Sequence, residues 1–290
     1  MKTEILSSKQ IKEAADILKN GGLVAIPTEA VYGLAANALD GEAVKKIFIA
    51  KGRPGDNPLI VHISELEEIY PLVSDFPLIA QKLTQKYWPG ALTIVLPKSD
   101  IIPDEVSAGL NSVAIGFRAH SVARAVIKEA GVPLAAPSAN ISGSPSPTKV
   151  SHVFKDLNGK IDAILDGGDC AIGLESTVIS FMGDVPKLLR PGGVTKEQIE
   201  SVIGPIEVDD AVLNQVSGNQ KVESPGMKYK HYAPSAKVII LKGTQNRYID
   251  YVNAHNAPDV LALCYNGDKA LLKAKSISYG EENEYSSQAN

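Results

Sequence analysis

Apolar residues recur along the chain at two spacings, and the alternation between these spacings predicts helices and strands in turn. From residue 11 to residue 18 they return every three or four positions, which indicates a helix with one buried face. Asn20-Gly21-Gly22 ends this helix, because glycine tolerates the left-handed backbone conformation found at helix C-termini. Residues 23–26 are then continuously apolar, so we expect a short buried strand that stops at Pro27.

The same two spacings continue to about residue 203 without an internal repeat. Further strands are predicted at residues 59–63, 92–96, 113–117, 134–136, 162–165, 177–180 and 188–190, and further helices near residues 40–48, 77–87, 122–130 and 195–202. Interleaved strands and helices predict an α/β or α+β domain, built on a twisted mixed β-sheet with flanking helices. Polar residues follow several strands directly, and such sheets usually bind their ligands at strand ends.

The last third of the chain has a different character. No helical period is sustained from about residue 204 to residue 224, which is typical of a linker. Apolar runs at 238–241 and 260–263, with a helix expected near Tyr248, predict a small β-α-β unit of Rossmann-like type. We therefore predict a large domain over residues 1–204, a linker over 205–235 and a small α/β domain over 236–290.

Composition narrows the class of protein. The 290 residues are 44% hydrophobic, which is ample for a core, and no apolar run approaches the roughly 18 residues of a membrane span. No apolar secretion segment follows Met1, and the two cysteines lie in different predicted domains. We therefore expect a cytoplasmic protein without a disulfide framework or a zinc site. The net charge of −4 argues against a protein that coats nucleic acid, although cations could still gather in a cleft that attracts a nucleotide.

Three short strings combine rigid Pro or Gly residues with groups that bind anions. They are PTEAVYGL at residues 27–34, KGRPGDNPL at 51–59 and APSAN at 136–140. In the second string the Arg53 guanidinium offers a planar fork to phosphate oxygens, and Lys51 offers a compact charge. A site that handles a triphosphate needs such groups. The sequence contains no GxxxxGK[ST] loop, GxSxG turn or zinc-ligand spacing, so this is not a standard P-loop enzyme.

Each of these residues also has a purely structural interpretation. Lys51 and Arg53 suit a helix C-terminus, and a histidine inside an aliphatic run, such as His62, is more often a core residue than a ligand. Turns, strand ends or a helix cap would equally explain the remaining polar candidates, which are Arg118, Ser138, Asn140, Thr148 and Arg190.

The three strings, in this order and spacing, resemble the YrdC-like catalytic domain of the threonylcarbamoyl-AMP synthase family. The resemblance runs from the N-terminus to Pro191-Gly192-Gly193. PGMKYKHYAP at residues 225–234 is similar to the linker of the two-domain members, whose C-terminal unit is usually longer than here. The resemblance implies a concave cleft in the catalytic domain, with the linker folding over it to shield an unstable intermediate from water.

The reaction that the resemblance implies condenses L-threonine, bicarbonate or CO2 and ATP into threonylcarbamoyl-AMP and pyrophosphate. That makes the protein a nucleotidyltransferase of tRNA modification, whose product a separate tRNA threonylcarbamoyl transferase consumes. ATP would bring its own Mg²⁺, and no organic cofactor is expected. Whether tRNA touches the protein directly stays open.

The resemblance also implies a role for individual residues. Those implied for ATP are Lys51, Arg53, Asn57, Asn140, Thr148, Arg190 and Tyr232, of which Lys51 and Arg53 would offset charge as pyrophosphate leaves. Those implied for threonine are Thr28, Ala30, Tyr32, His62, Arg118, Ser138 and Ser176. Thr28 and Tyr32 are expected on the pocket wall. Ala30 is a departure, because the family usually has threonine there, and the missing hydroxyl hydrogen bond is typically worth about 1 kcal/mol.

Two other functions remain open on the sequence. A carbamoyl-transferring maturation protein of the hydrogenase type contains a related domain, but such chains are much longer and carry cysteine-rich zinc fingers, unlike the two isolated cysteines here. A non-catalytic RNA-binding module could use a concave basic face, although the acidic net charge counts against it.

Overall fold

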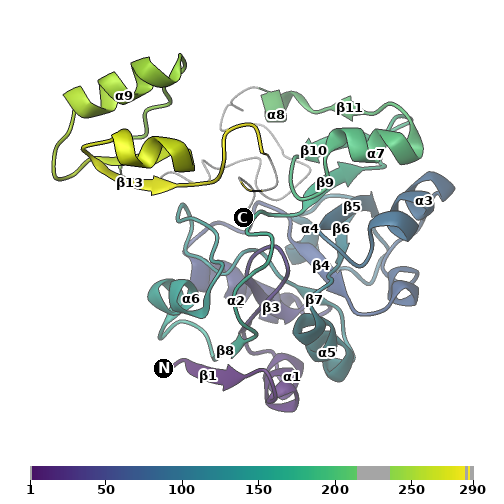
Figure 1. The fold of residues 1–290 in the computed structure, drawn as a ribbon. Coiled ribbons are helices and arrows are strands. Elements are labelled where there is room, and N and C mark those ends of the chain that lie inside the picture. The colour runs from purple at the N-terminus through teal and green to yellow at the C-terminus, as the bar shows by residue number, and fades with distance from the viewer. Residues whose placement is uncertain (1, 214–235, 285–286, 288–290) are drawn as a thin grey trace. The chain divides into compact units, whose positions relative to one another are not determined.

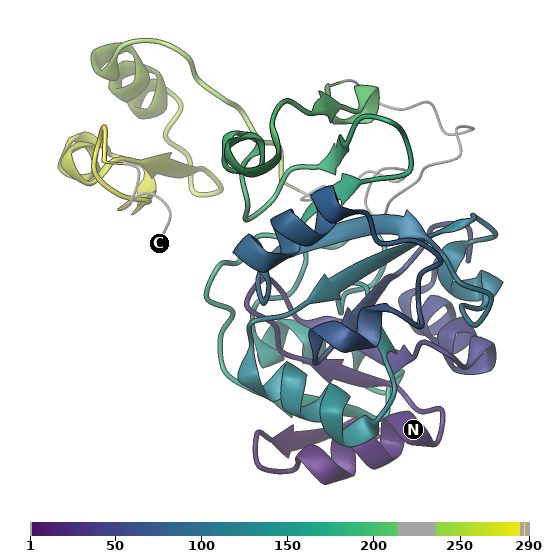
Figure 2. The same ribbon diagram turned by 90° about the vertical axis from the view of Figure 1, so that its right-hand side faces the viewer.

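The computed structural model describes residues 2–213, 236–284 and 287, and it divides the chain into two compact units, Met1–Ala233 and Pro234–Asn290 (Figure 1). The first unit confirms the predicted mixed α/β fold, because its strands form one large twisted sheet with helices packed against it (Figures 1 and 2). Within the described residues this sheet has eleven strands, in the order β1-β8-β2-β3-β7-β4-β6-β5-β9-β10-β11. Parallel and antiparallel neighbours both occur in it, as in the pairs β1–β8 and β2–β3.

Most predicted elements of the first unit are present close to their expected positions. The sequence analysis missed the strands Glu4–Ser7, Gly33–Asn37 and Glu207–Val208 and the helices Asp104–Ser107, Val150–Leu157 and Asp210–Leu213. The strands are β1 Glu4–Ser7, β2 Val24–Ile26, β3 Gly33–Asn37, β4 Ile60–Ile63, β5 Leu92–Pro97, β6 Ser112–Phe117, β7 Leu134–Ala135, β8 Ala163–Asp166, β9 Thr177–Ser180, β10 Lys187–Arg190 and β11 Glu207–Val208. The helices are α1 Ile11–Lys19, α2 Gly41–Lys51, α3 Leu78–Tyr87, α4 Asp104–Ser107, α5 Ser121–Ala130, α6 Val150–Leu157, α7 Lys196–Ile203 and α8 Asp210–Leu213, with a short 3₁₀ helix η1 at Leu66–Ile69. None of the described helices is long and apolar enough to cross a membrane.

Successive residues of the central strands face two separate apolar clusters. In β2, Val24 and Ile26 pack with α1 and α5, whereas Ala25 belongs to the cluster that contains α2, α3, α6 and α7. In β8, Leu165 and Ile164 are divided between the same two clusters. Because side chains alternate across a strand, helices cover both faces of the sheet at β2 and β8 and bury most of these two strands.

Residues 205–213, the described part of the predicted linker, contain regular structure. β11 pairs in parallel with β10 at the edge of the sheet, and the single turn of α8 follows it. The family-like linker string at 225–234 lies outside the described residues. The domain boundaries themselves stay a prediction.

The second unit differs from the predicted strand order. It contains α9 Gln245–Ala254, β12 Leu261–Cys264, the 3₁₀ helix η2 Asn266–Leu271 and β13 Lys275–Ser278, and β12 pairs in parallel with β13. The helix around Tyr248 and the strand near 260–263 are present, but the strand predicted at 238–241 is not formed. Val238, Ile239 and Ile240 are all exposed and pair with no strand within the described residues, and only Leu241 of this run packs against the core of the second unit.

The two faces of α2 should respond very differently to the same substitution. Ile47 is completely buried in the main core, whereas Ile49, half a turn along, is 78% exposed. We expect Ile47→Ala to lower the free energy of unfolding by about 2–5 kcal/mol through lost burial and a residual cavity, and Ile49→Ala to change it by less than about 0.5 kcal/mol. Urea denaturation of both variants checks this, and equal effects would contradict the described packing of α2.

Candidate active site

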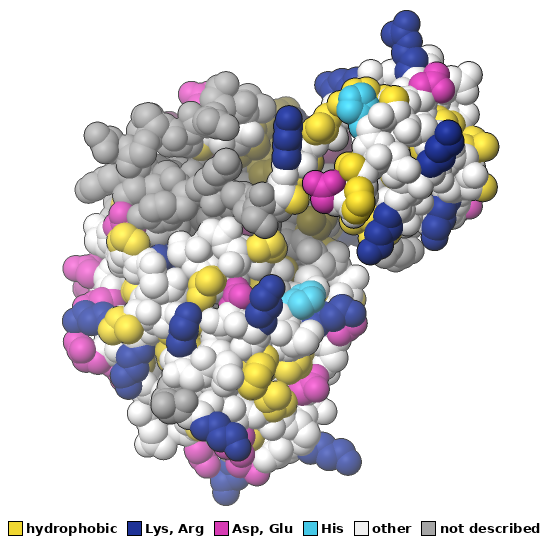
Figure 3. Space-filling model, turned by 90° about the vertical axis from the view of Figure 1, so that its left-hand side faces the viewer, with side chains coloured by type: hydrophobic (Ala, Val, Ile, Leu, Met, Phe, Trp, Pro, Cys, Tyr) yellow, Lys and Arg dark blue, Asp and Glu magenta, His cyan; other side chains and the backbone are white. Residues whose placement is uncertain are grey.

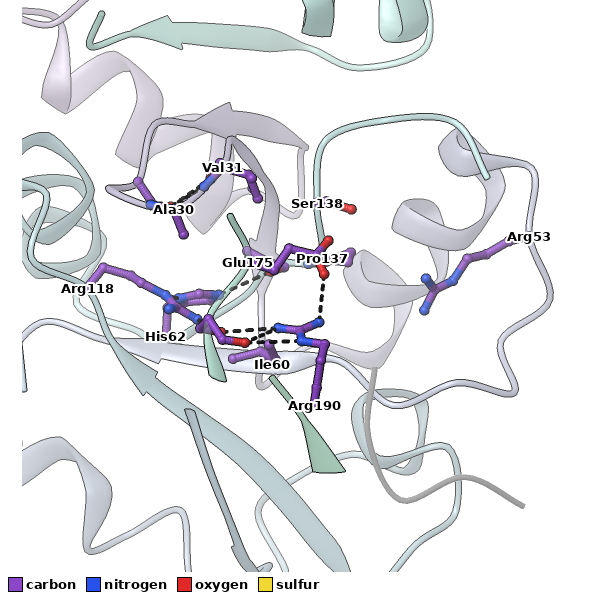
Figure 4. A pocket seen from close by; sticks show the side chains of 14 residues that line it. Ala30, Val31, Arg53, Ile60, His62, Arg118, Pro137, Ser138, Glu175 and Arg190 are labelled. Atoms are coloured by element: carbon purple, nitrogen blue, oxygen red, sulfur yellow. Dashed lines mark hydrogen bonds and ion pairs between the residues drawn. The ribbon is translucent and has the colours of Figure 1, made fainter. Parts of the chain in front are cut away.

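A pocket opens in the first unit where several strand ends meet (Figure 4). Its lining consists of Thr28, Ala30, Val31, Gly33, Arg53, Ile60, His62, Arg118, Ala136, Pro137, Ser138, Glu175, Ser176 and Arg190. More than half of these belong to the predicted site, namely Thr28, Ala30, Arg53, His62, Arg118, Ser138, Ser176 and Arg190. In the view of Figure 4, Arg53 reaches toward the pocket from one side and Arg118 from the other.

The strand order explains why residues so distant in sequence meet here. β7, β4, β6, β5, β9 and β10 are successive neighbours in the sheet. His62 lies in β4 and Arg190 in β10, Arg118 directly follows β6 and Ser176 directly precedes β9. Ser138 lies three residues after the end of β7. The sheet therefore delivers the polar side chains next to one another, and the loops between strands need only carry them to its edge.

The Arg118 guanidinium is buried at the bottom of this cluster. Its Nε donates to His62 Nδ1 at 2.9 Å, and its Nη2 donates to the hydroxyls of Thr93 at 3.2 Å and Ser176 at 3.4 Å. Its Nη1 faces Glu29 Oε1 at 3.8 Å, which is an ion pair but longer than a hydrogen bond. Burial lowers the Arg118 pKa, and the Glu29 carboxylate opposes this change. A buried cation needs such compensation, so the network fixes where the guanidinium points.

His62 serves this network as a neutral side chain. Because Nδ1 accepts the hydrogen bond from Arg118, the proton lies on Nε2, which donates to the carbonyl of Ala136 at 3.1 Å. Burial lowers the His62 pKa well below its usual value, and the nearby Arg118 charge lowers it further. His62 therefore orients Arg118 and is not placed as a general base.

Ser176 lies between two arginines. Its hydroxyl accepts hydrogen bonds from Nη2 of Arg118, at 3.4 Å, and from Nη2 of Arg190, at 3.2 Å. Its backbone carbonyl accepts from Nε and Nη2 of Arg190, at 3.1 and 2.8 Å. Arg190 Nη1 also forms an ion pair of 3.1 Å with Glu175. Gly192 allows the backbone after Arg190 to pass close to the backbone of Glu175, because a Cβ at residue 192 would lie 2.3 Å from the Glu175 carbonyl oxygen. Two positive side chains are thus held close together at one wall of the pocket.

Lys51 and Arg53 separate at the end of α2. Gly52 adopts the left-handed conformation, with φ of 62°, and turns the chain between them. Lys51 is buried and does not line the pocket, and its Nζ donates to the carbonyls of Ser138 and, at 2.6 Å, Asn140. Burial, and then the Arg53 charge, lower the Lys51 pKa to about 7. Its observed contacts support the APSAN loop from behind.

Arg53 lines the opposite side of the pocket. Its guanidinium lies 5.5 Å from the centre of the Phe48 ring, and its Nη2 donates to the Asn57 carbonyl at 3.3 Å. Asn57 is fully buried, and its side-chain amide makes no hydrogen bond within the described part of the chain. The KGRPGDN string therefore presents the Arg53 guanidinium to the pocket, and the Asn57 amide is buried four residues later.

The PTEAVYGL string forms a turn closed by its own threonine. Thr28 Oγ1 accepts from the backbone N–H of Ala30 and Val31, both at 3.1 Å, and donates to the Val31 carbonyl at 2.7 Å. Thr28 and Ala30 both line the pocket, as expected for Thr28. The expectation that Tyr32 lies on the pocket wall is wrong. Its ring is fully buried, its hydroxyl donates to the Gly168 carbonyl at 2.7 Å, and burial raises its pKa to about 12.

Two further predicted nucleotide contacts, Asn140 and Thr148, do not line the pocket. Asn140 is buried and donates from Nδ2 to the carbonyls of Ile141 and Ser144, at 2.8 and 2.7 Å, so it shapes the loop that contains Ser138. Thr148 is half-buried just before α6 but does not cap that helix, whose first flanking residue is Lys149. Tyr232 lies outside the described residues.

Sequence reasoning missed three residues of the cluster. Glu29 and Glu175 each stand directly beside a residue that was singled out, so inspection of the neighbouring acids in both strings could have found them. Thr93 could not be identified as a site residue from the sequence, because it lies inside the apolar run of β5, where a β-branched residue is typical of any strand. Only the three-dimensional structure shows its hydroxyl 2.9 Å from that of Ser176.

The pH dependence of stability should reveal the buried neutral His62. In the unfolded chain a histidine binds a proton below about pH 6.5, whereas folded His62 resists it, so lowering the pH favours unfolding. Between pH 6.5 and pH 5 this contributes a loss of about 2 kcal/mol in unfolding free energy. We therefore expect wild type to lose that much stability relative to His62→Gln, measured by urea denaturation across this range. If the unfolding free energies of the two proteins changed equally with pH, His62 would not be neutral in the folded protein. His152→Gln, which replaces an exposed histidine, is the control.

Comparison with known proteins places the chain in a family. Residues 16–192 match the family model of Sua5, YciO and YrdC described as "Telomere recombination", and residues 194–290 match the model "Threonylcarbamoyl-AMP synthase, C-terminal domain". A relative named threonylcarbamoyl-AMP synthase from Bacillus subtilis is 55% identical over 239 residues, which are 82% of this chain and 68% of the relative. A relative of the same name from Pyrococcus abyssi is 50% identical over 244 residues, 84% of this chain and 71% of the relative.

A solved structure agrees with the sequence comparisons. The crystal structure of Pyrococcus abyssi Sua5 complexed with L-threonine has a TM-score of 0.90 and 43% sequence identity, and the match covers 99% of this chain and 86% of that one. Both halves of the chain thus match the same kind of protein. The chain belongs to the threonylcarbamoyl-AMP synthase family.

Proposed function

We propose that the pocket condenses L-threonine, bicarbonate or CO2 and ATP into threonylcarbamoyl-AMP and pyrophosphate. The observation that carries this proposal is the convergence of three arginines on one pocket, with Arg118 buried at its base and Arg53 and Arg190 on its walls. A small amino acid with one carboxylate and a nucleotide with a long anionic tail would together match such a charge distribution.

The threonine side of the site centres on Arg118. Its Nη1 makes no hydrogen bond to another described residue, so its N–H groups can bind a carboxylate oxygen of the amino acid. Thr28, Ala30, Ser138 and Ser176 line the pocket around it, and His62 fixes its orientation. The methyl of Ala30 replaces the hydroxyl usual in the family, so this chain would bind threonine with one polar contact fewer.

The ATP side would be formed by Arg53, Arg190 and the APSAN loop. Arg53 can approach the triphosphate directly, and Lys51 acts by holding the carbonyls of that loop in place. Asn57, Asn140, Thr148 and Tyr232 remain proposals for nucleotide contacts. Glu175, the carboxylate of the pocket wall, already pairs with Arg190, so Mg²⁺ would arrive with the triphosphate and keep its phosphate ligands.

The chemistry asks for little covalent participation by the protein. The threonine amine attacks CO2 and loses a proton, which gives a carbamate. A carbamate oxygen then attacks the α-phosphorus of ATP, the bond to the bridging oxygen breaks, and pyrophosphate leaves. Alignment of two anions that would otherwise repel one another, and compensation of charge on the leaving pyrophosphate, are the tasks that the arginines can perform.

The cellular setting follows from the product. An activated carbamoyl group on threonine suits transfer to a tRNA adenosine by a separate transferase, in the cytoplasm where tRNA is modified. The RNA-binding alternative finds less support in the charge distribution. On the face of the molecule in Figure 3, the Lys and Arg side chains lie scattered, and several stand beside Asp or Glu.

The experiment that tests the function is release of pyrophosphate from ATP in the presence of bicarbonate and an amino acid. We expect release to depend on threonine and to be about tenfold slower with serine, which lacks one methyl group. Arg53→Ala should lower turnover by about 100-fold or more, because charge on the leaving group is no longer compensated. Lys45→Ala removes a half-exposed cation from the first half of α2, away from the pocket wall, and serves as the control.

Two results would overturn the proposal. One is pyrophosphate release that does not change when threonine is omitted. The other is full turnover in Arg53→Ala, with a melting temperature equal to that of wild type. A salt-dependent complex with tRNA in the absence of ATP and threonine would instead favour the RNA-binding alternative.

A further inference from the structure

Glu29 is a buried carboxylate that does not line the pocket. Its side chain is 10% exposed, and the residues on either side of it, Thr28 and Ala30, form the wall instead. A carboxylate in this position is costly unless its charge is compensated and its oxygens are hydrogen-bonded. The partners of Glu29 therefore show what it does.

One carboxylate oxygen of Glu29 is anchored to the chain just after Arg118. Oε2 accepts from the backbone N–H of Ala119 at 3.0 Å and of His120 at 3.2 Å. These two residues lead into α5, and His120 offers no side-chain cap to that helix. A carboxylate is favourable at a helix N-terminus, so this anchor is rigid. The peptide segment that follows Arg118 is thereby fixed.

The other carboxylate oxygen of Glu29 faces the guanidinium of Arg118. Oε1 lies 3.8 Å from Arg118 Nη1, and neither atom makes a hydrogen bond within the described part of the chain. Nε and Nη2 of Arg118 are bound by neutral acceptors, which are His62, Thr93 and Ser176. Glu29 therefore supplies the charge that keeps a buried guanidinium in place, without occupying the N–H groups of Nη1.

We propose that Glu29 is a positioning residue for the amino-acid substrate, because it holds Arg118 at both its backbone and its guanidinium while leaving Nη1 free to bind the substrate carboxylate. This inference rests on the proposed function of the pocket. Without the Glu29 charge, Glu175 is the next carboxylate that acts on the Arg118 guanidinium. If Arg118 turned toward Glu175, it would disturb the ion pair of Glu175 with Arg190.

The matched variants are Glu29→Gln and Glu200→Gln. Glu200 also accepts a backbone N–H, from Ile206 at 3.3 Å, and pairs with a cation, Lys196 at 2.6 Å, but it lies in α7 away from the pocket wall. We expect Glu29→Gln to weaken threonine binding by about tenfold or more in calorimetry and to raise the KM for threonine equally. The kcat at saturating threonine and the KM for ATP should change less than about threefold, and Glu200→Gln should change none of these values.

A purely structural role would give a different result. It would lower the melting temperature and the fraction of active protein, which reduces kcat and leaves the threonine KM unchanged. If Glu29→Gln does not fold, Glu29→Asp keeps the charge but withdraws it by one methylene, and it should also weaken threonine binding. Unchanged threonine affinity in a folded Glu29 variant, with wild type active, overturns the positioning role. Failure of wild type to bind threonine overturns the proposed function and this inference with it.

Discussion

The site depends on one constraint, which is that the cation of Arg118 is buried and must be compensated by the protein around it. Four elements contribute to this compensation: Glu29 from the first loop, His62 from β4, Thr93 from β5 and Ser176 before β9. Transferring a charge from water into the protein interior costs several kcal/mol unless such partners are in place. The same contacts that satisfy the charge also fix its direction, so folding the domain and orienting its amino-acid site are one event.

The sheet is the frame that makes this possible. The strands β7, β4, β6, β5, β9 and β10 are successive neighbours, so a small shift of one strand would separate the hydroxyl of Ser176 from the two arginines that share it. Lys51 has a comparable role on the other side. It is placed by the end of α2 and ties the loop of Ser138 and Asn140 to that helix. Rigid elements thus hold both sides of the pocket in register.

Much of the fold follows from the sequence, because hydrophobic runs bounded by Pro and Gly mark the buried strands β2, β4, β5 and β6 plainly. Part of the site could also be predicted, since Arg118 stands directly after β6 and Ser138 a few residues after β7. Three features could not be read in this way. Tyr32 is buried in the core and bonds to the Gly168 carbonyl. Lys51 is buried and bonds to two loop carbonyls instead of lining the pocket, and residues 238–240 are exposed and join no described strand. Each depends on contacts between distant segments, which no local pattern records.

The claim that Arg118 receives the amino acid is tested most directly by calorimetry of threonine binding to wild type and Arg118→Lys. Lysine keeps the positive charge but lacks the planar fork, so it can replace neither the bond to His62 nor the pair of N–H groups at Nη1. One molecule of threonine should bind wild type, and the affinity of Arg118→Lys should fall by about tenfold or more, with the melting temperatures of both proteins measured alongside. Equal affinity in the two proteins would contradict the central role of the buried guanidinium.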